Sequence, residues 1–337
     1  MSDAAVQSSG VPGAAPSADD HVIAFQTVRS GVSGRIVRLG PAVNEILTRH
    51  DYPGPVSQVL GEALSLTAML GSQLKFNGKL ILQTNTDGPL GFIVVNYETA
   101  GTFRGYASYD AAKIAALEAG GKVNAGALLG RGHLAMTIDP GGDMDRYQGI
   151  VAIGNGTLSD AALEYFRSSE QLPTFIKLAV ARHFSAGVWR WRAGGLMVQH
   201  LTAEGGEAIP ERDDGTQSGW VLGSDDENWR RVEILASTVE DHELLDPMLS
   251  PERLLYRLFH EEGVTAGPAQ PVAMRCGCSR EHVGMFLTRF GSHELSDMRD
   301  PDGAVTVTCE FCATPYRFSG EELAGEQLQP GPPTWSP

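Results

Sequence analysis

Four cysteines, all in the last quarter of a 337-residue chain, constrain the fold more than any other feature. They form a Cys-x-Cys pair, Cys276 and Cys278, and a Cys-x-x-Cys pair, Cys309 and Cys312, with thirty residues between the pairs. Two thiolate pairs at the two ends of one small domain can meet as a tetrahedral Cys₄ zinc site. The spacing therefore predicts one zinc ion per chain, bound by these four residues.

The segment that holds the cysteines, residues 268–325, is too short to bury much apolar surface, so zinc binding should supply much of its folding free energy. A purely structural zinc ribbon is the usual interpretation of such a site. Two features favour a redox role instead. Each pair is close enough in sequence to close on itself as a disulfide. Arg275 and Arg280 flank the first pair and favour thiolate, the form that binds zinc and reacts with oxidants.

Other candidate sites in the chain are weaker. His282 and His293 lie between the cysteine pairs, but four thiolates already complete a zinc site. Residues 130–135 (Gly-x-Gly-x-x-Ala) match a dinucleotide-binding loop, yet they run into a strand-like segment instead of a helix. Residues 260–262 (His-Glu-Glu) begin like a metalloprotease helix, but the second histidine is missing, which indicates the charged end of an ordinary helix. We therefore expect no enzymatic activity.

Charge and composition narrow the classes of partner. The formal net charge is -15, and nonspecific binding to nucleic acid or to an anionic membrane needs a cationic face. No apolar run is long enough to cross a bilayer, and residues 1–20, rich in Ala, Ser, Gly and Pro, do not resemble a signal peptide. We expect a cytoplasmic protein. In that reducing compartment four cysteines favour a metal or redox site over structural disulfides.

Apolar periodicity predicts an α+β core domain over residues 21–200. Alternating residues on both sides of a turn predict a hairpin over 22–39, and helical spacing predicts helices over 41–50 and 56–70. Further strands are expected over 79–83, 91–97, 103–109, 133–139, 147–153, 174–183 and 189–201, and a helix over 158–169.

An acidic segment follows, which we expect to be a helical linker over residues 201–267. Sixteen acidic residues and five basic residues lie between Glu204 and Glu262. Apolar residues at helical spacing predict two helices whose charged faces point to solvent. One carries Val232, Leu235 and Val239, and the other carries Leu254, Leu255, Leu258 and Phe259. Ser250, followed by Pro251, is the expected N-cap of the second helix. Residues 263–270 are expected to form a short linker to the cysteine segment. The two tails, 1–20 and 326–337, are expected to be loose.

A series of ordered motifs resembles a known family from about residue 25 to residue 318. The segments are HDYP at 50–53, VLGE at 59–62, LKF at 74–76, DGP at 87–89, RYQG at 146–149, SEQLPT at 169–174, LFHEE at 258–262, C-x-CSRE at 276–281 and the Cys-x-x-Cys pair. With these motifs the chain resembles the heat shock protein 33 family of redox-regulated holdase chaperones, also called 33 kDa chaperonins.

The resemblance implies an N-terminal α+β core, a metastable helical linker and a C-terminal zinc domain. Under oxidative stress the four cysteines would release zinc and form two disulfides, Cys276–Cys278 and Cys309–Cys312. The oxidised protein would then dimerise and hold unfolding client proteins without ATP. The chain departs from the family pattern in its extended N-terminal tail and in a longer loop around residues 205–219.

Two other classes remain as alternatives. A Cys-x-x-Cys pair is typical of thiol-disulfide oxidoreductases, although there it normally opens a helix in a βαβ unit and has no second thiol pair beside it. A zinc-ribbon module that binds nucleic acid would carry a cationic surface, and the acidic segment beside the cysteines speaks against one.

Overall fold

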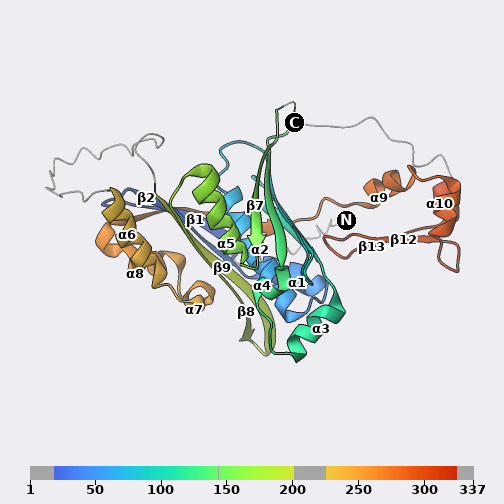
Figure 1. Ribbon diagram of the computed structural model, residues 1–337. Helices are drawn as coiled ribbons and strands as arrows, with labels where there is room; N and C mark the ends of the chain where they lie inside the picture. The colour runs from blue at the N-terminus through green and yellow to red at the C-terminus, as the bar shows by residue number, and fades with distance from the viewer. Residues whose placement is uncertain (1–18, 143, 201–224, 325–337) are drawn as a thin grey trace, which may run out of the picture.

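The chain is described by a computed structural model over residues 19–142, 144–200 and 225–324. Two large β-sheets and the helices packed on them form the core, and a small two-stranded sheet lies apart from them near the C-terminus (Figure 1). The predicted α+β class is confirmed. Within the described ranges, no helix is both long enough and apolar enough to cross a membrane.

The first sheet contains five antiparallel strands. Their order is β10 (Val264–Pro271), β1 (His21–Thr27), β2 (Val32–Leu39), β9 (Val188–His200) and β8 (Thr174–Ser185). Strands β1 and β2 pair from His21 opposite Arg38 to Gln26 opposite Ser33, which confirms the predicted hairpin. The predicted strands over 174–183 and 189–201 are also confirmed, and they pair with each other along their whole length.

The second sheet contains the other predicted strands of the core. Its order is β11 (Ala273–Met274), β5 (Thr102–Ser108), β4 (Phe92–Glu98), β3 (Lys79–Thr86), β6 (Arg131–Asp139) and β7 (Tyr147–Gly154). All neighbours are antiparallel except β11, which runs parallel to β5. The short strand β11 comes directly before the first cysteine pair.

A buried helix packs against both sheets. Helices α1 (Pro41–Arg49) and α2 (Gly54–Gly71) confirm the predicted pair, and α2 packs on β8 and β9 of the first sheet and on β3, β4 and β5 of the second. The predicted helix over 158–169 is α5 (Leu158–Tyr165), continued by a π-helical turn over Phe166–Glu170. The sequence interpretation missed α3 (Ala111–Ala119) and α4 (Ala125–Leu129), which begin at the side-chain caps Asp110 and Asn124.

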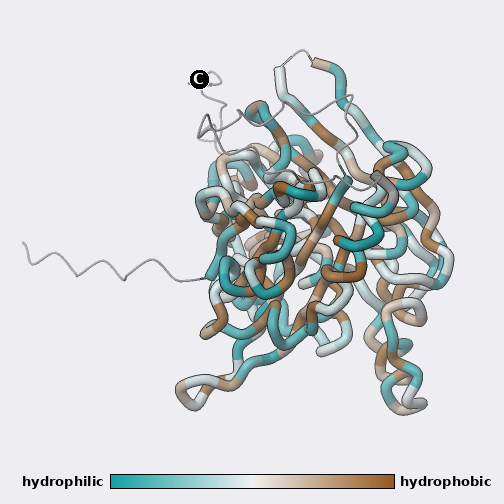
Figure 2. The backbone as a smooth tube through the Cα atoms, turned by 90° about the vertical axis from the view of Figure 1, so that its left-hand side faces the viewer, coloured by the Kyte–Doolittle hydropathy of each residue, from teal (hydrophilic) through white to brown (hydrophobic). Residues whose placement is uncertain are grey.

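The acidic segment forms α6 (Asp225–Ser237), α7 (Asp241–Leu245) and α8 (Pro251–Phe259), and Ser250 caps α8 as its sequence predicts. Its apolar faces lie in one buried cluster with residues of β1, β2, β8 and β9; Phe259, for example, stacks on Phe25 with ring centroids 5.5 Å apart. Figure 2 views the molecule from this side, where apolar and polar stretches alternate along the tube. Residues 201–224 of the expected linker lie outside the described residues.

These three helices lie on the opposite side of the core from the cysteine segment (Figure 1). They dock on the core: α6 and α7 contact β8 and β9, and α8 contacts α6 and β10. Any influence of the cysteines on these helices must therefore pass through the core or through β10.

The expected connection over residues 263–270 is instead strand β10, which pairs with β1 from Val264 opposite Thr27 to Pro271 opposite His21. The side chains of β10 are almost all exposed, so the segment lacks the apolar alternation that marks a strand in a sequence. Main-chain hydrogen bonding to the edge of the hairpin defines it, and this depends on tertiary structure.

The cysteine segment contains α9 (Arg280–Leu287), α10 (Ser292–Asp297), β12 (Val305–Thr308), β13 (Pro315–Phe318) and α11 (Gly320–Ala324). Strands β12 and β13 form an antiparallel hairpin. The buried apolar cluster of this segment consists of only four residues, Leu287, Leu295, Val305 and Phe318. So small a core contributes little stability, as expected from the length of the segment.

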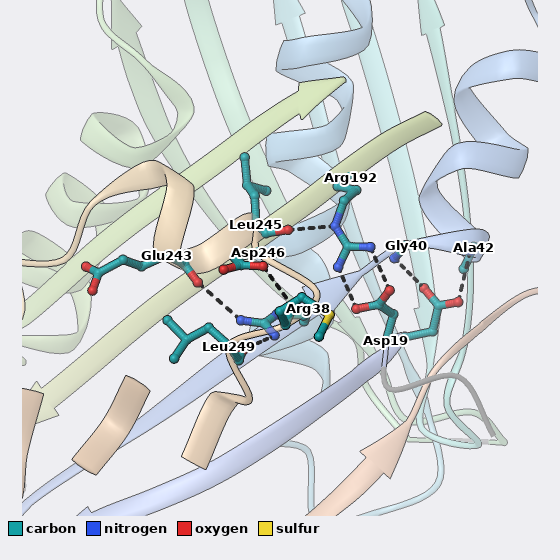
Figure 3. Close-up of polar contacts among 11 residues, drawn as sticks. Asp19, Arg38, Gly40, Ala42, Arg192, Glu243, Leu245, Asp246 and Leu249 are labelled. Carbon is teal, nitrogen blue, oxygen red and sulfur yellow. Dashed lines mark hydrogen bonds and ion pairs between the residues drawn. The ribbon is translucent and has the colours of Figure 1, made fainter. Parts of the chain in front are cut away.

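Two arginines of the first sheet bind the main chain of the acidic segment (Figure 3). Arg38, 2% exposed, donates hydrogen bonds to the carbonyl oxygens of Leu249 and, at 3.2 Å, Glu243. Arg192 donates to the carbonyl oxygen of Leu245 at 2.7 Å and pairs with Asp19. The helices are thus docked by buried cations as well as by apolar contacts.

Asp19 and Asp20 belong to the stretch predicted as a loose tail, and both have defined contacts. The carboxylate of Asp20 accepts hydrogen bonds from the backbone N–H groups of Gly40, at 2.8 Å, and Ala42, at 3.0 Å, at the start of α1. The rest of the expected tail, residues 1–18, lies outside the described residues, as does the expected tail over 326–337.

We expect Arg38→Met to loosen α7 and α8 while the core sheets remain folded. The substitution removes two charge-assisted hydrogen bonds, each of which contributes about 1.5–3 kcal/mol. Together they correspond to about 3–6 kcal/mol, so amide hydrogen exchange over residues 241–259 should become at least about a hundredfold faster. Arg190→Met, an exposed position on β9, is the matched control. Unchanged exchange in α7 and α8 would contradict the anchoring role of Arg38.

Candidate metal and thiol centre

The four predicted cysteines converge at one point in the structure. Their sulfur atoms all lie within 4.8 Å of one another, and no other group of three or more His, Cys, Asp or Glu side chains in the described part of the chain is arranged to hold a metal ion. Cys312 is buried and the other three are half-buried. The structure thus brings together residues that are separated by thirty positions in the sequence.

Local structure positions each pair. Cys276 and Cys278 follow β11, and Ser279 then caps α9 by accepting a hydrogen bond from the backbone N–H of His282 at 3.2 Å. Cys309 and Cys312 lie in the tight turn between β12 and β13. In this turn the Cys309 N–H donates to the carbonyl of Thr314 at 3.0 Å, so that both sulfurs of the pair face the first pair.

The distances between the sulfur atoms fit a metal ion with four sulfur ligands in tetrahedral arrangement. Zn–S bonds of about 2.3 Å in a regular tetrahedron place the sulfurs about 3.8 Å apart. The Sγ atoms of Cys276 and Cys309 are 3.7 Å apart, and those of Cys278 and Cys312 are 3.3 Å apart. Both of these short distances join one pair to the other, which is the arrangement expected of a closed metal site.

The thiols differ in how readily they ionise. Burial raises the pKa of Cys278 to about 12, although the Tyr316 hydroxyl donates to its Sγ at 3.2 Å and opposes the rise. Burial also raises the pKa of Cys309. Burial disfavours the Cys312 thiolate as well, but hydrogen bonding with Thr314 and with the neighbouring thiols outweighs it and lowers the pKa of Cys312 to about 7. Cys312 therefore ionises near neutral pH and can bind a metal or react in that form.

The other sequence candidates are not part of this centre. His282 lies 3.3 Å from the carbonyl oxygen of Gly277 and His293 lies 3.4 Å from Asp297, both through Nδ1, and neither joins the thiols. Residues 260–262 form a 3₁₀ turn at the end of α8, in which Glu262 pairs with Arg231. Residues 130–135 enter strand β6, as their sequence suggested.

Arg280, one of the two flanking arginines, pairs with Glu322 at 2.6 Å and stacks over Phe318. The arginine that contacts the centre is Arg104 of strand β5, whose Nη1 lies 3.8 Å from the Sγ of Cys276. Sequence reasoning missed Arg104 because it precedes that cysteine by 172 residues and only the sheet brings them together.

Comparison with known proteins gives one consistent result. The family model described as "Hsp33 protein" matches residues 20–319. A protein named "33 kDa chaperonin" from Caulobacter vibrioides is 43% identical over 301 residues, which cover 89% of this chain and 95% of the relative. A protein of the same name from Ectopseudomonas mendocina is 35% identical over 294 residues, covering 87% and 90%.

Among solved structures, the 33 kDa chaperonin of Thermotoga maritima, described as a heat shock protein 33 homologue, has a similar fold. The TM-score is 0.69 at 24% identity, with 90% of this chain and 97% of the other covered. At this identity the likeness concerns the fold.

Proposed function

The chain belongs to the Hsp33 protein family and is a chaperone, and from this premise we propose that it is a redox-regulated, ATP-independent holdase. In this proposal it binds unfolding proteins under oxidative stress and prevents their aggregation. The observation that carries the proposal is the convergence of four thiols in a segment with almost no apolar core. Such a segment changes its folding state when its thiols change their chemistry.

In the reduced state Cys276, Cys278, Cys309 and Cys312 would hold one zinc ion as thiolates. When bound, the ion supplies four bonds that cross-link the segment and keep its sulfurs together. The sulfur distances and the absence of a histidine from the centre support this ligand set.

Oxidation would convert the centre into two disulfides. In each pair two thiolates would lose two electrons to one peroxide molecule, which takes up two protons from solvent and becomes two molecules of water, so that two peroxide molecules serve both pairs and the zinc ion is released. We propose Cys276–Cys278 and Cys309–Cys312 as the products, because each pair is adjacent in sequence. The thiolates are then no longer available as ligands, and residues 268–325 lose most of the free energy that folds them.

We propose a division of the chain into parts that serve this function. Residues 21–200 form the chaperone core, residues 201–267 a metastable acidic linker, and residues 268–325 the switch, with tails over 1–20 and 326–337. The active form would be an oxidised homodimer in the cytosol that binds unfolded client proteins and neither nucleic acid nor membranes. The docking of α6, α7 and α8 on the first sheet supports a linker whose release would expose apolar core surface.

The two alternative functions receive less support. In a thiol oxidoreductase the Cys-x-x-Cys pair opens a helix, whereas here it lies in a turn between two strands. A nucleic-acid module needs a basic surface, and the chain has 41 acidic against 26 basic residues.

We expect one zinc ion per chain in the reduced protein. Elemental analysis of protein purified under reducing conditions measures it, and Cys309→Ser should lower zinc affinity strongly because one of four ligands is lost. His282→Ala, next to the centre but outside it, serves as the control and should retain the metal. Two ions per chain, or full zinc binding by the serine variant, would contradict this ligand set.

We expect the oxidised protein to suppress thermal aggregation of an unfolding reporter enzyme and the reduced, zinc-loaded protein to be inactive. Light scattering without nucleotide measures the effect, and re-reduction of the oxidised sample with added zinc tests whether it reverses. Equal activity of the two forms would exclude the redox switch, and a requirement for ATP would exclude a holdase.

The two disulfides should form in a fixed order. Closing Cys276–Cys278 spans one intervening residue and should be more strained than closing Cys309–Cys312 across two, and strain makes a disulfide more reducible. We therefore expect Cys309–Cys312 first, together with zinc loss. Mass mapping during a peroxide time course resolves the order. Early Cys276–Cys278, with zinc still bound when Cys309–Cys312 closes, would refute it.

A further inference from the structure

Arg104 lies where the core meets the cysteine centre. Strand β5 carries it at the edge of the second sheet, next to β11. Its guanidinium contacts the Sγ of Cys276 through Nη1 at 3.8 Å, and its Cζ lies 4.1 Å from the ring centroid of Phe311. Phe311 stands inside the Cys-x-x-Cys pair, so this one side chain of the core contacts both halves of the centre.

Main-chain hydrogen bonds fix the segment beside Arg104. The N–H of Ala273 donates to the carbonyl of Gly101 at 2.8 Å, and the N–H of Arg275 donates to the carbonyl of Phe103 at 3.1 Å. Arg275 directly precedes Cys276. A shift of the first cysteine pair away from the core would therefore break both the contact with Arg104 and the pairing of β11.

The second cysteine pair has its own contact with the core. Arg49, at the end of α1, donates to the carbonyl oxygen of Cys312 at 3.3 Å. This contact reaches the main chain, and it does not depend on the chemical state of the sulfur. The contact of Arg104 reaches a sulfur directly, so it does depend on that state.

The chemistry of Arg104 suits a charged sulfur centre. No carboxylate in the described ranges forms an ion pair with Arg104, so sulfur and ring are the groups that its charge faces. Four thiolates around a divalent zinc ion carry a net charge of about −2, which a nearby guanidinium stabilises. Its flat face also favours the aromatic ring, a geometry that lysine does not reproduce.

We propose that Arg104 is a positioning residue that clamps the cysteine centre onto the core sheet and makes the docking of the centre depend on the charge of its sulfurs. The proposal rests on the redox function proposed above for the reaction that removes this charge. When two thiols become a disulfide, the sulfur no longer bears negative charge and the clamp loses its electrostatic component. The pairing of β11 with β5 is then the first core contact to weaken.

The test compares Arg104→Gln, Arg104→Lys and Phe311→Leu with the control Arg131→Gln, an exposed arginine at the start of β6 in the same sheet. Full-length reduced protein is used. One readout is amide hydrogen exchange at Ala273 and Arg275, and the other is the rate of zinc transfer to a chromophoric chelator. Exchange at β3 and β4 reports whether the core of each variant is folded.

We expect Arg104→Gln to speed both exchange at the two amides and zinc transfer about tenfold, the lower end of what is typical when a residue that supports metal ligands is lost. Arg104→Lys, which keeps the charge, should recover most of the zinc retention. Phe311→Leu, which removes only the ring, should give an intermediate loss, and Arg131→Gln should match the wild type.

If Arg104→Gln showed the wild-type rates of amide exchange and of zinc transfer, the clamp would be refuted. Equal losses in the lysine and glutamine variants would overturn the role of charge. If the wild-type protein binds no zinc, the proposed function fails, but hydrogen exchange at β11 in the same variants still decides whether Arg104 docks the segment.

Discussion

Four sulfur atoms converge in a part of the chain whose own apolar core is too small to provide much stability. The buried apolar cluster of the cysteine segment has four residues, whereas the cluster around α2 has more than forty. Under the proposed function, loss of the metal that joins the sulfurs would therefore unfold the segment and leave the core folded. Because the two apolar clusters differ so much in size, the cysteine segment could unfold while the core domain stays folded.

The described structure separates the thiol centre from the acidic helices by the width of the core (Figure 1). The chain between them is β10 followed by β11, which pair with β1 and β5 in different sheets. Strand β10 also contacts α8. The chain thus provides a short covalent route from the cysteines to the acidic helices, along strands that each pair with one neighbour at a sheet edge.

Sequence patterns predicted the parts of this structure that local chemistry determines. Alternation and helical spacing located the core elements, and the cysteine spacing identified the residues that meet at the centre. Strand β10 could not be predicted, because its exposed side chains show no periodicity. The role of Arg104 could not be predicted either, because only sheet pairing brings it to Cys276. The same holds for Arg38, since its partners are main-chain carbonyls, which no side-chain pattern reveals.

Ionisable side chains near the acidic helices have opposite effects on the stability of the folded state. Lys177 of β8 pairs with Asp241 of α7 at 2.7 Å, which favours docking. Burial, with a smaller contribution from Asp241, raises the pKa of Glu62 on α2 to about 7. The folded state thus favours protonated Glu62, so its contribution is complete below the ordinary pKa of 4.5 and is lost as the pH rises through about 7. Above about pH 7 the ionised Glu62 carboxylate therefore works against the folded state. The apolar cluster, the two buried arginines and the Lys177–Asp241 ion pair offset this effect.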